Sequence, residues 1–102
     1  MIQNNMRPVH PGEILREEYL IPLELSANRL ARDLRVPVTR ISKILNEERS
    51  VTPDTALRLA RYFGGDAQTW LNLQAAYDLK TTIKDHGKEI EQDVRPMDTV
   101  AA

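Results

Sequence analysis

Basic side chains gather in the middle of this 102-residue chain. Five bases and one acid lie between positions 29 and 43, whereas three bases and five acids lie between positions 84 and 98. Guanidinium and ammonium groups bind phosphate oxygens and guanine edges, so a local excess of base favours a nucleic-acid partner even in a protein whose net charge is −1. The bases are Arg29, Arg32, Arg35, Arg40 and Lys43, and the acid among them is Asp33.

Residues suited to other chemistry are scarce. The chain has no cysteine, and its two histidines stand far apart at positions 10 and 86. Neither a pair of metal ligands at a usual spacing nor a glycine-rich phosphate loop occurs. The Glu17-Glu18 and Glu47-Glu48 pairs are interpreted as solvated surface acids. We therefore expect no catalytic residue, metal site or cofactor, and we expect that the protein is not an enzyme.

The composition predicts one small domain. The chain is 41% hydrophobic, enough for a modest core. No apolar run approaches the length of about 18 residues that a membrane span needs, and the first residues lack the apolar core of a secretory signal. The expected location is therefore the cytoplasm.

Helix signals recur along the chain, and alternating strand patterns are nearly absent. Ser26, Thr52 and Asp66 are predicted to cap helices with their side-chain oxygens. We expect Pro22 to end the first helix, and Asn46 to close the third with a left-handed backbone. The five predicted helices run from Pro11 to about Leu20, from Ser26 to Leu34, from Pro37 to about Asn46, from Thr52 to Phe63 and from Asp66 to about 80, with Ile83 and Ile90 as a possible extension. The core-facing residues expected on the fourth are Ala56, Leu57, Ala60 and Phe63.

The second and third of these helices are short and are joined by only two or three residues. So tight a connection favours a steep crossing, which is the geometry of a helix-turn-helix whose second helix enters the major groove of DNA. We therefore predict a helix-turn-helix between Ser26 and Asn46. An ordinary amphipathic helix with a solvated face is the alternative interpretation of the third helix.

At about 100° per residue, the third helix divides into a polar half and an apolar half. Thr39, Arg40 and Lys43 fall on the polar half, where they can reach base edges or phosphates. Ser42 lies on the flank, where its hydroxyl can touch a phosphate. Val38, near the start of the helix, can meet a thymine methyl group. The apolar half, made of Ile41, Ile44 and Leu45, is expected to face the core.

The order and spacing of several short motifs point to a family. His10-Pro11-Gly12-Glu13-Ile14-Leu15 comes first, followed by Leu25-Ser26, Asn28, Leu30-Ala31 and Val36-Pro37. The run from Thr52 through Asp54 to Gly64 and the Trp70-Leu71-Asn72-Leu73-Gln74 segment with Tyr77-Asp78-Leu79 complete the series. Over residues 7 to 80, the chain closely resembles the HigA family of antitoxins, which belongs to the phage-repressor-like helix-turn-helix class.

The resemblance implies a fold and a function. The fold is all-α, a compact five-helix domain of the lambda-repressor-like type. The function is that of a dimeric antitoxin, which binds a HigB-type toxin that cleaves mRNA on the ribosome and represses the promoter they share by binding palindromic double-stranded DNA. The candidate DNA-binding residues are Ser26, Asn28, Val38, Thr39, Arg40, Ser42, Lys43 and Arg49.

Two departures from the family pattern concern residues expected to contact DNA phosphates. Ala27 stands where many relatives carry a glutamine that contacts a phosphate, and Asn46-Glu47-Glu48-Arg49 replaces a common Asn-Gly-Lys-Arg. Acids near phosphates weaken binding, and loss of glycine removes an easy left-handed turn. A stand-alone transcription regulator of the same class and a protein-interaction module with weakened DNA binding therefore remain alternative functions.

The expected organisation is a flexible arm over residues 1–9, a helix-turn-helix domain over 10–80 and a polar extension over 81–102 that is partly helical and then frayed. Trp70, Leu71 and Tyr77 are interpreted mainly as core residues. The surplus apolar surface of the last helix predicts a homodimer through the C-terminal helices.

Overall fold

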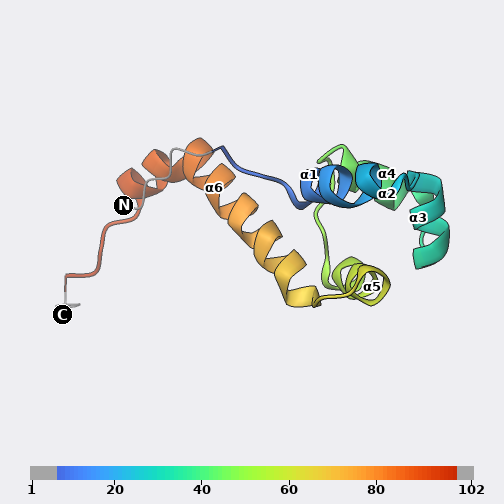
Figure 1. Ribbon diagram of the computed structural model, residues 1–102. Coiled ribbons are helices and arrows are strands. Elements are labelled where there is room, and N and C mark those ends of the chain that lie inside the picture. Colours follow the sequence, from blue (N-terminus) through green and yellow to red (C-terminus); the bar gives the residue numbers. More distant parts are fainter. Residues whose placement is uncertain (1–6, 99–102) are drawn as a thin grey trace.

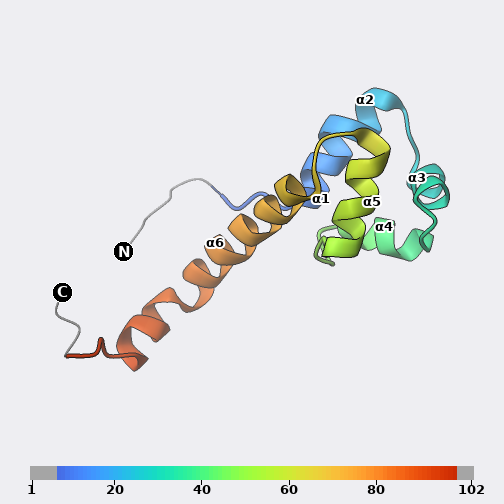
Figure 2. The same cartoon turned by 90° about the horizontal axis from the view of Figure 1, so that it is seen from below.

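The computed structural model describes residues 7–98, and all regular structure in that range is helical. The first three segments follow one another without a break and form a single helix, so the five-helix all-α prediction is confirmed. Figures 1 and 2 show these helices in two views. The elements are α1 (Pro11–Ile14), η1 (Leu15–Leu20), α2 (Ile21–Leu23), α3 (Ala27–Leu34), α4 (Val38–Leu45), α5 (Pro53–Phe63) and α6 (Ala67–Asp93).

The first helix continues through Pro22, where the sequence predicts its end. Its central segment η1 is a π-helical turn, in which the Ile21 N–H bonds to the Arg16 carbonyl five residues earlier. In an α-helix, a proline ring collides with the carbonyl four residues before it. The wider π turn directly ahead of Pro22 relieves that collision, and the helix ends only at Leu23, followed by Glu24 in a left-handed conformation (φ 53°).

The core lies where the first helix, α3, α4 and α5 meet. Leu15, Leu30, Ile41, Ile44 and Leu59 are completely buried there. Each such aliphatic side chain contributes about 1.5–3 kcal/mol to folding when it is removed from water. Ile41 and Ile44 belong to the apolar half predicted for the third helix, so this half holds α4 on the domain.

On α5 the prediction of the buried face is partly wrong. Thr55, Ala56 and Leu59 are the buried residues, whereas the side chain of Leu57 is 64% exposed. Leu57 lies about 140° around the helix from the centre of the buried face, so hydrophobicity alone misplaced it. Its exposure leaves an apolar side chain on the surface beside α3.

α6 begins close to α5 and then projects away from the other helices (Figure 1). Asp66 caps it by accepting from the Thr69 N–H at 2.8 Å, as the sequence predicts. Trp70 and Gln74 are its buried residues, and the helix continues past them to Asp93. The projecting half gives the molecule extents of 54 × 22 × 21 Å. The predicted limits at residues 9, 10, 80 and 81 stay predictions, and residues 1–6 of the predicted arm lie outside the described residues.

None of the helices described for residues 7–98 combines the length and the apolar character that crossing a membrane requires.

Candidate nucleic-acid interface

Local caps define the start and end of α3. The Ser26 hydroxyl oxygen accepts from the Arg29 N–H at 3.0 Å, which confirms the predicted cap. α3 ends at Arg35, whose left-handed backbone (φ 63°) turns the chain toward α4. Pro37, extended at φ −61°, precedes the first turn of α4 rather than lying in it. Ser26 and Asn28 are both exposed at the N-terminal end of α3.

The outer face of α4 is open to solvent. Val38 is 39% exposed, and Thr39 and Lys43 are also exposed. Ser42 is half-buried at the flank of the helix, as expected from its angular position around the helix axis. The opposite face of this helix holds the buried Ile41 and Ile44. Four of the candidate residues thus occur together on one short helix.

Arg40, the remaining candidate on α4, is turned toward α5. One of its terminal nitrogens lies 2.6 Å from the Asp54 carboxylate, and its side chain is only 24% exposed. The same carboxylate oxygen accepts from the Arg58 Nε at 2.9 Å. Hydrogen bonds from Arg58 and then Arg40 lower the pKa of Asp54, so this carboxylate stays ionised at neutral pH. Its contact with Asp54 ties the first turn of α4 to the first turn of α5.

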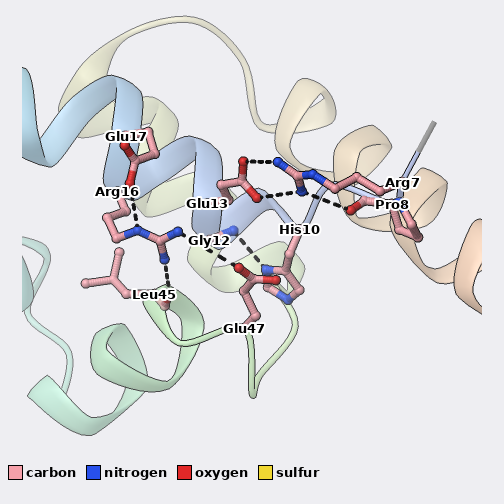
Figure 3. A network of polar contacts seen from close by, with 9 residues as sticks. All are labelled: Arg7, Pro8, His10, Gly12, Glu13, Arg16, Glu17, Leu45 and Glu47. Atoms are coloured by element: carbon pink, nitrogen blue, oxygen red, sulfur yellow. Dashed lines mark hydrogen bonds and ion pairs between the residues drawn. The ribbon is translucent and has the colours of Figure 1, made fainter.

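Two arginines cap the carboxyl ends of the helix-turn-helix. Arg58 donates to the Leu34 carbonyl at 2.8 Å, at the end of α3. Arg16 donates to the Leu45 carbonyl at 2.6 Å, at the end of α4 (Figure 3). The last carbonyls of a helix lack partners within it and carry partial negative charge, which a guanidinium satisfies. Neither arginine is recognisable as a cap from the sequence, because these contacts span 24 and 29 positions.

The start of α1 packs directly beneath the end of α4. A Cβ atom on Gly12 would overlap the Ile44 carbonyl oxygen and lie 2.8 Å from the carbonyl carbon. Only a residue without a side chain therefore lets the two backbones approach so closely. Gly12 belongs to the predicted His-Pro-Gly motif, but the sequence gives no sign of which segment it touches.

His10 caps the same helix from a buried position. Its Nδ1 accepts from the Gly12 N–H at 2.8 Å, as Figure 3 shows, and its ring stands edge to face on Tyr77 of α6. Burial lowers the pKa of His10 below 6.5, against the opposing charges of Glu47 and Asp78 and a hydrogen bond to the Arg49 backbone. An acceptor nitrogen must be unprotonated, so the cap requires the neutral ring.

We therefore expect the free energy of unfolding to fall as the pH drops from 7 to 5. A histidine whose pKa is lower in the folded state contributes stability that is fully present above pH 6.5 and is lost as the pH falls through that value toward its folded pKa. His10→Asn keeps a capping acceptor without a titrating ring and should flatten the profile in this window. Denaturation at several pH values, with His86→Gln as the control, measures the difference. An unchanged slope in His10→Asn would contradict the assignment.

The loop between α4 and α5 is held by a buried glutamine. Gln74 Oε1 accepts from the Val51 N–H at 2.8 Å, and its amide donates to Asp78 at 3.0 Å. The sequence shows Gln74 only as a polar interruption in an apolar face. Within this loop Asn46 has φ −86°, and Glu47 is the left-handed residue (φ 64°), so the prediction of a left-handed Asn46 is wrong by one position.

Gln74→Leu is expected to lower the free energy of unfolding by about 1–3 kcal/mol. The change preserves volume approximately but leaves the buried Val51 N–H without an acceptor, and an unsatisfied buried donor has that effect. Gln68→Leu removes an exposed glutamine from the same helix and is the matched control. Equal midpoints for the two variants in urea denaturation would argue against the buried hydrogen bond.

The remaining residues of the interface lie on either side of α4. Arg49 is exposed in the loop that follows, beside the exposed Glu47 and Glu48. A terminal nitrogen of Arg16 lies 4.0 Å from the Glu47 carboxylate, which offsets part of its charge. Ala27, the first residue of α3, is half-buried against the core. The acids therefore lie in the loop and not on the outer face of α4.

Comparison with known proteins places this geometry in a family. The model of the family described as helix-turn-helix matches residues 15–70, which include α3, α4 and α5. Virulence-associated protein I of Dichelobacter nodosus is 61% identical over 83 residues, or 81% of this chain and 77% of that protein.

Solved structures share the arrangement over almost their whole length. An addiction module antidote protein of the HigA family from Coxiella burnetii superposes with a TM-score of 0.84 at 54% identity, covering 90% of this chain and all of that one. The antitoxin HigA of Pseudomonas aeruginosa, solved with the higBA promoter, gives a TM-score of 0.86 at 45% identity, covering 89% of this chain and 99% of that one.

Proposed function

Because the chain belongs to the HigA family of helix-turn-helix proteins, we propose that it is a cytoplasmic antitoxin that represses its own operon as a DNA-bound dimer. Its second role in this proposal is to neutralise a HigB-type toxin that cleaves mRNA. The observation that carries the DNA-binding part is the open outer face of α4, set beside the capped start of α3.

In the proposed complex, α4 lies in the major groove. Val38 and Thr39 at its start, with Lys43 one turn later, face the base edges or the nearest phosphates. Ser26 uses its hydroxyl oxygen for the cap, which leaves the hydroxyl proton free to bond to a phosphate oxygen. Ser42, Asn28 and Arg49 complete the contacts from the flank of α4, from α3 and from the following loop.

Footprinting of the DNA upstream of the protein's own gene tests this proposal. We expect two protected half-sites related by a palindrome, with centres one helical turn, or about 34 Å, apart. Protection should weaken steeply as salt rises, because phosphate contacts release counterions. Absence of protection at low salt would refute DNA binding and leave the interaction-module alternative.

The proposed dimer uses the projecting half of α6. Leu79, Ile83, Ile90 and Val94 follow one another at spacings of four, seven and four residues, with Val94 just after the helix end. Leu79, Ile90 and Val94 are 62%, 49% and 63% exposed. A helix with such a stripe outside the core requires another apolar surface. Light scattering should give the mass of a dimer at concentrations where DNA is bound, and a monomer would contradict the proposal.

The toxin is tested separately. Co-expression with the neighbouring reading frame should yield a complex that copurifies and relieves toxicity. Operator binding without any such partner would instead identify a stand-alone regulator of the same class.

A further inference from the structure

Arg40 is a candidate DNA-binding residue whose guanidinium already binds another residue of the protein. Its guanidinium lies on the flank of α4 that faces α5, with one terminal nitrogen 2.6 Å from the Asp54 carboxylate. Its Nε is buried and has no hydrogen-bond partner within the described part of the chain. The guanidinium is therefore only partly satisfied where it lies, although an ion pair holds it there.

The carboxylate of Asp54 has a second cationic partner besides Arg40. Arg58, one turn further along α5, donates its Nε to the same carboxylate oxygen at 2.9 Å. Arg58 is itself fixed, because a terminal nitrogen bonds to the Leu34 carbonyl at 2.8 Å. If Arg40 leaves, Asp54 keeps a cation, so the carboxylate is not left unpaired. Among residues 7–98, Arg40 has no comparable second anchor, so it is the least firmly held of the three.

We propose that Asp54 restrains Arg40 in the free protein, and that Arg40 moves to a backbone phosphate when α4 enters DNA. The inference rests on the proposed DNA binding. A phosphate is the appropriate acceptor, because Arg40 lies to the side of the outer face of α4, where the strand bordering the groove passes. The restraint lowers affinity for all DNA alike, since phosphate contacts carry no sequence information.

Asp54→Asn tests the restraint. We expect it to raise affinity for the operator and for a random duplex of equal length by the same factor, about fivefold, which corresponds to the upper range of a partly exposed ion pair. Asp33→Asn removes the same charge from α3, where Asp33 pairs with Arg29, and is the control for general electrostatics. Thermal denaturation of each variant checks that the fold is retained.

The double variant decides whether the effect passes through Arg40. In an Arg40→Gln background, Asp54→Asn should change affinity no more than Asp33→Asn does. An equal gain with and without Arg40, a gain confined to the operator, or weaker binding by Asp54→Asn would each overturn the inference. If the unaltered protein binds no DNA, the proposed function fails as well. If it binds and Asp54→Asn behaves like Asp33→Asn, only the restraint fails.

Discussion

Gly12→Ala is expected to lower the free energy of unfolding by about 3 kcal/mol, the upper range for forcing an added methyl into a packed site. The methyl group would overlap the Ile44 carbonyl oxygen, which belongs to the backbone and cannot rotate away as a side chain can. α1 and the end of α4 must therefore separate. Because Ile41 and Ile44 are completely buried on this side of α4, the separation also opens the core beneath α4.

Gly87→Ala provides the matched control. Gly87 lies within α6, on the half that projects beyond the core, where alanine favours a helix over glycine by about 1 kcal/mol. The same substitution should therefore destabilise at position 12 and stabilise at position 87. Chemical denaturation of both variants measures the two signs. Equal midpoints would show that the close approach of α1 and α4 is not required.

Local features of the fold could be predicted from the sequence. The Ser26, Thr52 and Asp66 caps are confirmed, because a cap is a contact across three residues and its residue types are diagnostic. The His10 cap is equally local. Family membership could also be predicted, since the order of several motifs carries more information than any one of them.

Long-range contacts could not be predicted in the same way. Arg16 and Arg58 look like ordinary surface bases, and nothing near them in sequence indicates the carbonyls of Leu45 and Leu34. The spacing of four residues between Asp54 and Arg58 is typical of an ion pair on one face of a helix. The Arg40 to Asp54 pair depends instead on how α4 crosses the start of α5.

The difference between local and long-range contacts matters most for the candidate DNA-binding site. The wheel correctly placed Thr39 and Lys43 on the exposed face, and it placed Arg40 about 100° away, near the border of the apolar half. A border position is compatible with either DNA or a neighbouring helix as the partner. In the structure the partner of Arg40 is Asp54 of the neighbouring helix, so the assignments of Lys43 and Arg40 to DNA rest on different grounds.

Lys43→Glu is expected to lower operator affinity by about a hundredfold and to reduce the salt dependence of binding. Loss of a phosphate or base contact costs about 1–3 kcal/mol, and the new carboxylate adds repulsion at the same place. Lys43 is exposed in the last turn of α4, outside the core. The fold should therefore survive with a small loss, because a negative charge near a helix C-terminus is unfavourable by about 0.3–1 kcal/mol.

Lys84→Glu introduces the same charge change on the exposed surface of α6 and is the control. If α4 is the element that enters DNA, affinity measured at several salt concentrations should fall much further for Lys43→Glu than for Lys84→Glu. Similar losses for the two variants would mean that only the net charge matters, and α4 would then no longer be assigned to the groove. A large loss in Lys43→Glu with thermal stability nearly unchanged would tie DNA binding to the outer face of α4, independently of Arg40 and its contact with Asp54.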